Sequence, residues 1–180
     1  MRINYTEQEL VAGCLKGRPE LQRALYLKYA RTMLGICIRY TRDKMEAEDT
    51  LQLGFMKVFD HLNSFKGGSL EGWMKRIFVR ESIDQFRRNR KSVFNYSQEP
   101  EDHHAIELDD VVGQLSAEEI IQMVNLLPEG CKVVFNLYAV EGYNHREISE
   151  MLGISDGTSK SQYFRAKEIL KEKIYARENG

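Results

Sequence analysis

The chain has 180 residues, 42% of them apolar, and a formal net charge of −1. This apolar fraction is typical of a globular protein, and no apolar run reaches the roughly 18 residues of a membrane span. The polar start MRINYTEQELVAG lacks the apolar core of a signal peptide. Three widely spaced cysteines form neither a disulfide framework nor a zinc motif. We therefore expect a cytoplasmic protein without membrane contact of its own.

The small net charge conceals three segments of different charge. Residues 19–91 hold 15 Lys+Arg against 9 Asp+Glu, residues 92–126 hold 8 acids and no Lys or Arg, and residues 127–175 hold 7 of each kind. Such a division indicates two domains joined by an acidic connector, and the basic first part favours a polyanionic partner. We predict domains at 1–92 and 115–180, with a flexible acidic linker at 93–114.

Helical spacing of apolar residues, without a period-two strand pattern, predicts an all-α fold. In the first domain Thr6 is placed to cap a short helix, and a helix of about twenty residues follows Pro19. Asp43 can cap a third helix. Residues 63–69, which include two glycines, predict a loop, after which a fourth helix runs to about Arg90.

The second domain is predicted to begin at a capping box formed by Ser116 and Glu119. Pro128 opens the next helix at a favoured early position, and Gly142 ends it. Residues 144–174 then have the pattern of a helix, a tight turn and a second helix, which is the arrangement of a DNA-binding helix-turn-helix.

In that helix-turn-helix, Gly153 supplies the turn and Ser155 stands at the cap position of the second helix. At about 100° per residue, one side of the second helix gathers Ser159, Tyr163, Ala166, Leu170 and Ile174. The other side presents Lys160, Ser161, Phe164, Arg165 and Lys171. An aromatic ring among cations on a polar face is explained if DNA buries it.

Four stretches of the chain resemble bacterial RNA polymerase sigma factors of the extracytoplasmic-function (ECF) group, in the sigma-70 family. They are AEDTLQLGF at 47–55, SFKGGSLEGWMKRI at 64–77, DQFRRNRK at 84–91 and EISEMLGISDGTSKSQYFRAKEIL at 147–170. The resemblance implies that the first domain is sigma region 2 and the second is sigma region 4. It implies a factor that binds core RNA polymerase and directs promoter recognition, −10 melting and transcription initiation.

The resemblance also assigns a polymerase-binding surface to the third helix. Glu48, Asp49 and Gln52 match the family's contacts with the clamp helices of the largest polymerase subunit, and Met56 lies beside them. Carboxylates and amides can form charge-assisted bonds with basic partner residues. Leu53 stands where the family commonly has an acid, so the full contact set is not implied.

For the −10 element, the resemblance implies capture of bases turned out of the stack by the 63–69 loop and the helix behind it. Phe65 and Lys66 offer stacking and charge to such bases. The further residues assigned to this surface are Trp73, Arg76, Arg80, Arg87 and Arg88. Arg80 stands where the family often has an asparagine, so a −10 sequence preference is not implied.

For the −35 element, the resemblance places duplex DNA under the second helix of the turn motif. The assigned residues are Thr158 and Ser161 for the backbone, and Lys160, Gln162, Phe164 and Arg165 for base edges. Ser159 occupies a position that is usually apolar in the family. A possible further partner is an anti-sigma factor, the inhibitor that the family commonly has.

Two other functions compete with this interpretation. A stand-alone helix-turn-helix regulator would bind operator DNA as a dimer, and a small nuclease would use the acids at 99–110. The pair His103 and His104 fits no known metal-ligand spacing, and we expect no metal, no cofactor and no catalytic residues.

Overall fold

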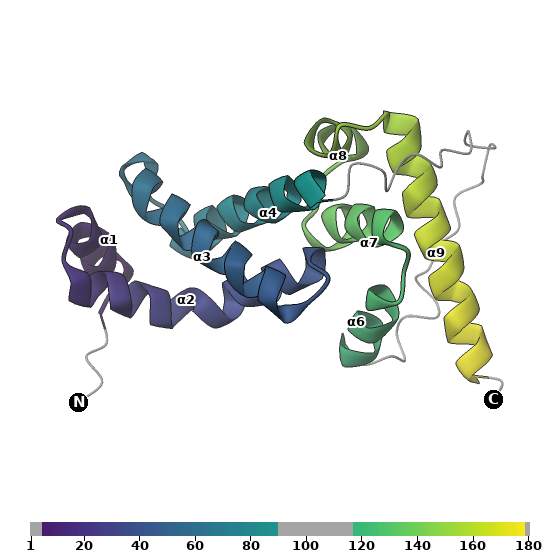
Figure 1. Ribbon diagram of the computed structural model, residues 1–180, viewed down its shortest axis with the longest axis horizontal. Coiled ribbons are helices and arrows are strands. Elements are labelled where there is room, and N and C mark those ends of the chain that lie inside the picture. The colour runs from purple at the N-terminus through teal and green to yellow at the C-terminus, as the bar shows by residue number, and fades with distance from the viewer. Residues whose placement is uncertain (1–4, 90–116, 179–180) are drawn as a thin grey trace. The chain divides into compact units, whose positions relative to one another are not determined.

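The computed structural model describes residues 5–89 and 117–178 of the chain (Figure 1). Contacts divide the chain into two units, Met1–Asn89 and Arg90–Gly180. All regular elements of the described stretches are helical, which confirms the all-α prediction. The predicted linker at 93–114 and the predicted Ser116 cap lie outside the described residues. Within the described parts, no helix is both long enough and apolar enough to cross a membrane.

The first unit consists of four α-helices and a short 3-10 turn within residues 5–89. In order they are α1 (Glu7–Leu15), α2 (Pro19–Tyr40), α3 (Lys44–His61), η1 (Leu62–Ser64) and α4 (Leu70–Asn89). Figure 1 shows α1 beside the first turns of α2 and the longer helices α2, α3 and α4 packed along one another.

Local capping explains where the first three helices begin. Thr6 and Glu9 form a reciprocal capping box at the start of α1, with the Glu9 amide 3.2 Å from the Thr6 hydroxyl. Pro19 is the first residue of α2, where a missing N–H costs nothing. The Asp43 carboxylate accepts a 2.8 Å bond from the Glu46 amide at the start of α3. The predictions made from Thr6, Pro19 and Asp43 are therefore confirmed.

The apolar core of the first unit lies between α2, α3 and α4. The Phe55 ring of α3 meets the Phe78 ring of α4 edge to face, with centroids 5.2 Å apart. Gly54 allows this approach, because a Cβ atom on it would lie 2.2 Å from Phe78 Cε1. Burial of rings and aliphatic side chains contributes about 1.5–3 kcal/mol each. This close contact therefore fixes α4, and the side chains on its outer face, to the rest of the unit.

The second unit consists of α6 (Ala117–Asn125), α7 (Glu129–Phe135), the π-helical segment η2 (Asn136–Val140), α8 (His145–Leu152) and α9 (Asp156–Glu178). Figure 1 shows α8 at the first turns of the long helix α9 and α6 beside its later turns. The core between α6, α7 and α9 is formed by Val124, Leu127, Cys131, Ala166 and Leu170.

Two boundaries in the second unit refine the predictions. Pro128 precedes α7 as its N-cap, with an extended backbone, and is not its first helical residue. The reason is that its ψ of 144° keeps the carbonyl end of the residue out of helical geometry. Helical structure continues from α7 through η2, and Gly142 follows with φ 80°, which ends it as predicted.

Replacement of Gly54 by alanine is expected to destabilise the first unit by about 1–3 kcal/mol, because the new methyl group overlaps the Phe78 ring. Thermal or urea unfolding of the full chain measures the effect. The matched control is Gly35→Ala in α2, where an added Cβ meets nothing within 4 Å. That change should stabilise the unit by about 0.5–1 kcal/mol. Equal effects of the two substitutions would contradict the proposed packing role of Gly54.

Candidate functional site

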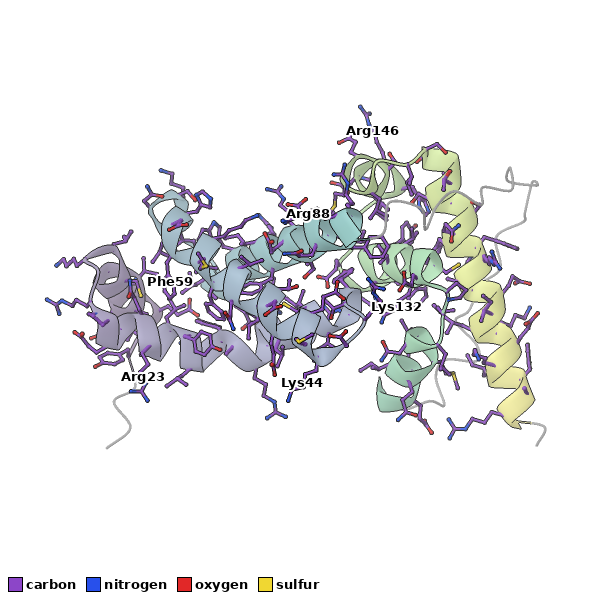
Figure 2. The ribbon with its side chains drawn as sticks, in the orientation of Figure 1. Arg23, Lys44, Phe59, Arg88, Lys132 and Arg146 are labelled. Atoms are coloured by element: carbon purple, nitrogen blue, oxygen red, sulfur yellow. The ribbon has the colours of Figure 1, made fainter. Side chains whose placement is uncertain are left out.

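The predicted polymerase-binding residues lie together on the exposed side of α3. Glu48, Asp49, Gln52 and Met56 all face solvent, and Met56 is 61% exposed. Their spacing of three and four residues places them on neighbouring turns of one face. Lys44 of the same helix lies 3.5 Å from the Glu48 carboxylate, and both side chains are largely exposed (Figure 2). We call Glu48, Asp49, Gln52 and Met56 the α3 surface.

A shallow groove runs beside the α3 surface. Asp49, Gln52 and Met56 line it, whereas Glu48 does not. Its other lining residues are Arg42, Asp43, Met45, Glu46, Thr50, Leu53 and Gln85. Leu53, which departs from the family's acid, is half-buried and gives the groove an apolar wall. The arrangement suits a partner segment that presents basic groups beside apolar ones.

The loop before α4 brings two predicted −10 residues into contact. The Phe65 and Trp73 rings have centroids 5.6 Å apart at an interplanar angle of 55°, and both rings are half-buried. Gly67 and Gly68 have φ of 100° and 84°, a backbone region that disfavours other residues. Ser69 then caps α4, since its hydroxyl accepts a 3.0 Å bond from the Gly72 amide. Lys66 is exposed in this loop.

Three of the four predicted arginines of α4 form an exposed cationic face. Arg76, Arg80 and Arg87 are exposed, and within the described stretches no acidic side chain pairs with them. Separations of four and seven residues put them on one side of the helix. Unpaired guanidinium groups on one face are suited to phosphate contacts, because each can donate a bidentate pair of hydrogen bonds.

Arg88, the fourth arginine, has a different environment. Its Nη2 atom lies 3.4 Å from the Oε1 atom of Glu81, whose side chain is only 1% exposed (Figure 2). The Lys57 ammonium of α3 also contacts the Glu81 carboxylate. Glu81 thus binds α3 to α4 through a buried charge shared by two cations. Sequence analysis did not predict this network, because Lys57 and Glu81 lie on different helices and far apart in the chain.

The helix-turn-helix forms as the local signals predict. Asn144 and Glu147 make a capping box at α8, and Gly153 ends that helix with φ 68°. The Ser155 hydroxyl accepts a 2.9 Å bond from the Thr158 amide at the start of α9. The Thr158 side chain also pairs with Ser155, at 2.8 Å between their hydroxyl oxygens. The prediction that Ser155 caps the second helix of the motif is confirmed.

Only two of the six predicted −35 residues are exposed. Lys160 and Arg165 face solvent, and Lys160 pairs with Asp156 one turn earlier at 2.6 Å. Phe164 is half-buried, and its assignment to base edges stays a prediction.

Internal bonds also engage three of the remaining predicted residues. Besides the Thr158–Ser155 pair, the Ser161 hydroxyl donates to the Thr158 carbonyl at 3.0 Å. The Cys131 thiol donates to the Gln162 side-chain oxygen at 3.1 Å. Gln162 therefore faces α7 in part, although its assignment to base edges stays a prediction.

Sequence reasoning missed His145, which lies at the first turn of α8. Its Nδ1 atom is 2.9 Å from the hydroxyl of Ser159, a fully buried residue of α9. Its ring also stacks on Tyr138, with centroids 4.5 Å apart and an interplanar angle of 18°. The available signal was Ser159 itself, since a hydroxyl at a usually apolar position requires a polar neighbour.

The described residues contain no group of three or more His, Cys, Asp or Glu side chains that could hold a metal ion. His103 and His104 lie outside the described residues. Burial raises the pKa of the Cys131 thiol and raises that of Cys37 to about 11, so neither thiol is activated as a nucleophile.

Comparison with known families identifies both units. The model of sigma-70 region 2 matches residues 25–92, and the model of sigma-70 region 4 matches residues 117–170. Together these matches cover more than half of the chain. The chain belongs to the sigma-70 family. It is a sigma factor, which directs RNA polymerase to promoters for transcription initiation. Two sigma regions in one chain decide against the stand-alone dimeric regulator.

Several similar proteins are named ECF sigma factors. The ECF RNA polymerase sigma factor SigM of Bacillus subtilis is 27% identical over 158 residues, which cover 82% of this chain and 91% of SigM. The ECF RNA polymerase sigma-E factor of Escherichia coli is 27% identical over 186 residues, with 97% of each chain covered. The RNA polymerase sigma-H factor of Pseudomonas aeruginosa is 25% identical over 182 residues, with 94% of each covered.

Two solved complexes are also similar. CnrH in complex with the cytosolic domain of CnrY has a TM-score of 0.49 and 17% identity, with 93% of this chain and 96% of CnrH covered. The sigma factor RpoE of Bartonella quintana, in complex with the anti-sigma factor NepR, has a TM-score of 0.48 and 23% identity. The comparison with RpoE covers 83% of this chain and 94% of RpoE.

Replacement of Glu81 by glutamine in this sigma factor should destabilise region 2 by about 1–3 kcal/mol, because a buried charge shared by Lys57 and Arg88 is lost. Urea unfolding measures the change. The matched control is Asp84→Asn, which removes a half-exposed carboxylate 3.9 Å from the same ammonium group. That variant should change stability by less than about 0.5 kcal/mol. A larger loss in Asp84→Asn than in Glu81→Gln would refute the role given to Glu81.

Proposed function

We propose that this sigma factor uses three separate surfaces: the α3 surface for core polymerase, the Phe65–Trp73 loop with the α4 arginines for the melted −10 element, and α9 for the −35 duplex. The observation that carries the proposal is the exposure of Lys160 and Arg165 on a helix whose opposite side is packed. Such a helix can enter the major groove without loss of its core contacts.

The α3 surface is proposed to bind the clamp helices of the largest polymerase subunit. Asp49 and Gln52 offer acceptors for basic partner residues, and Met56 offers apolar area at the edge of the groove. Methionine adapts its shape to an opposing surface, which suits a contact that forms and dissociates during each initiation cycle.

The −10 surface is proposed to shift the duplex toward its open form. Unstacking costs a few kcal/mol per base, and stacking on an aromatic side chain returns about 1–3 kcal/mol per base. Phe65 and Trp73 supply such rings, with Lys66 beside them for phosphate. Arg76, Arg80 and Arg87 are then placed on the outer face of α4 to hold the strand by its backbone.

Each surface alone is modest, so the free sigma factor is proposed to bind promoter DNA weakly. When the polymerase holds both units, the second contact becomes intramolecular and gains from effective concentration. Bond chemistry then belongs to the polymerase, and we assign this chain no catalytic residue and no cofactor. We propose that it acts in the cytoplasm together with the enzyme it serves.

An anti-sigma factor is a further proposed partner, because the family commonly has one. A protein that covered the α3 surface would block polymerase binding, and one that covered Lys160 and Arg165 would block promoter recognition. Exposed Met45 and Met56 give such an inhibitor apolar contact area on α3.

Variants of α3 and α9 should separate polymerase binding from promoter recognition. Asp49→Ala with Met56→Ala should weaken association with core polymerase by roughly tenfold, which equals about 1.4 kcal/mol. Lys160→Ala with Arg165→Ala should leave that association unchanged but lower −35-dependent initiation at least about tenfold, since each base contact contributes about 1–3 kcal/mol. Co-purification with core enzyme and transcription in vitro measure the two effects.

The control for both pairs is Lys16→Ala with Arg18→Ala, which removes two exposed cations between α1 and α2. This variant should bind core polymerase and initiate like the native chain. A loss of core binding in the α9 variant, equal to its loss of initiation, would show that α9 has been assigned the wrong role.

Arg87 and Arg88 should differ in their contribution to DNA binding. Arg87→Ala should reduce the salt dependence of holoenzyme binding to a promoter with an unpaired −10 strand by about 0.7 in the log–log slope, the value for one single-strand phosphate contact. Arg88→Ala should change the slope less, because Glu81 already holds that guanidinium. Equal slopes for the two variants would contradict the distinction between them.

A further inference from the structure

We infer that His145 and Ser159 are positioning residues for −35 recognition: their hydrogen bond fixes the first turns of α9 against α8, and protonation of His145 weakens that hold. The inference rests on the proposed role of α9 in binding the −35 duplex. Two residues that do not face DNA would thereby control the orientation of the residues that do.

The bond is placed where it can orient the DNA-facing residues. The Ser159 hydroxyl lies 2.9 Å from His145 Nδ1, and Ser159 is completely buried. Its sequence neighbours are Thr158 and Lys160, which belong to the proposed −35 surface. A buried polar bond has a narrow range of distance and angle, so it specifies the seating of a helix more sharply than apolar contact alone.

His145 continues the packed side of α8. Ile148 and Leu152 of this helix are buried, and His145 precedes Ile148 by three residues on the same face. The imidazole therefore occupies the end of the seam between α8 and α9. An apolar residue in this place would fill the seam, but it would leave the Ser159 hydroxyl buried without a partner.

Aromatic rings from two other elements contact the imidazole. Tyr138 of η2 stacks on it at 4.5 Å, and Tyr163 of α9 meets it at 5.8 Å with an interplanar angle of 60°. The two tyrosine rings are themselves 4.5 Å apart. The imidazole thus joins η2, α8 and α9, and a change in its charge acts on all three at once.

Burial favours the neutral form of His145, and the charges around the ring act in both directions. Burial lowers the pKa of His145 below the ordinary value of 6.5; Asp156 raises it, while Lys160 and Lys167 lower it. Tyr138 and Tyr163 are the other titratable groups in contact with the ring. Its own helix adds Arg146, which projects into solvent (Figure 2), and a positive charge at a helix N-terminus is unfavourable.

The direction of the pH effect follows from linkage. When α8 and α9 separate, the imidazole regains its ordinary pKa of 6.5, so below that pH the separated form binds more protons than the packed form. The packed form is therefore fully stable above pH 6.5 and loses stability as the pH falls toward the lowered pKa. Below that lowered value the loss no longer grows. Acidification should weaken −35 recognition before it affects polymerase binding.

The test compares holoenzymes assembled from core polymerase and the full chain on a duplex that carries the −35 element. His145→Asn is the decisive variant, because the Asn amide can replace the Nδ1 bond but does not titrate. The native holoenzyme should lose affinity between pH 7.5 and pH 5.5, whereas the His145→Asn holoenzyme should lose clearly less over the same range. His61→Asn, a change at an exposed histidine of the first unit, should retain the native pH profile.

Ser159→Ala provides the second measurement. Removal of one buried hydrogen bond should lower −35 affinity roughly two- to tenfold at pH 7.5, with core binding unchanged. Far-UV circular dichroism shows whether the variant retains its helices. If Ser159→Ala does not fold, the pH profiles of the native and His145→Asn holoenzymes decide the question. For each holoenzyme the affinity at pH 5.5 is compared with its own affinity at pH 7.5.

Failure of this inference can be distinguished from failure of the proposed function. If Lys160→Ala with Arg165→Ala binds the −35 duplex like the native protein, α9 does not have the proposed role and the inference falls with it. If that variant loses binding but the native and His145→Asn profiles are parallel, the role of α9 stands and the positioning by His145 is overturned.

Discussion

The close contact between Gly54 of α3 and the Phe78 ring of α4 is the constraint on which region 2 depends. It brings the two helices within reach of a common buried carboxylate, Glu81, which Lys57 and Arg88 share. The same packing turns the α3 surface and the α4 arginines to solvent on one rigid body. The proposed polymerase contact and the proposed −10 contact therefore belong to helices that have fixed positions relative to each other.

Region 4 has a different requirement. Its helix α9, which is proposed to bind the −35 duplex, must be held firmly while its outer side stays exposed. Apolar side chains of α6 and α7 hold the middle of α9, and the capping serine at 155 fixes where it begins. Near the start of α9 the contacts are polar and aromatic. His145 bonds to Ser159 of this helix, and Tyr138 stacks on His145. The first turns of α9, which are proposed to read DNA, are thus held by hydrogen bonds and ring contacts whose geometry is specific.

The features that sequence predicted well are those governed by neighbours in the chain. Caps at Thr6, Asp43 and Ser155 and the turn at Gly153 depend on residues within about one helical turn. Glu81 and His145 were missed because their partners lie on other helices, and a sequence pattern does not give such distances.

The contact between Phe65 and Trp73 has one more consequence. In the free protein each ring already has an aromatic neighbour, so an incoming nucleotide has to compete with an existing ring contact. The net gain from stacking a base there is the stacking free energy less whatever part of the ring contact is lost. On the proposed −10 surface, strand capture therefore depends on phosphate contacts as well as on stacking.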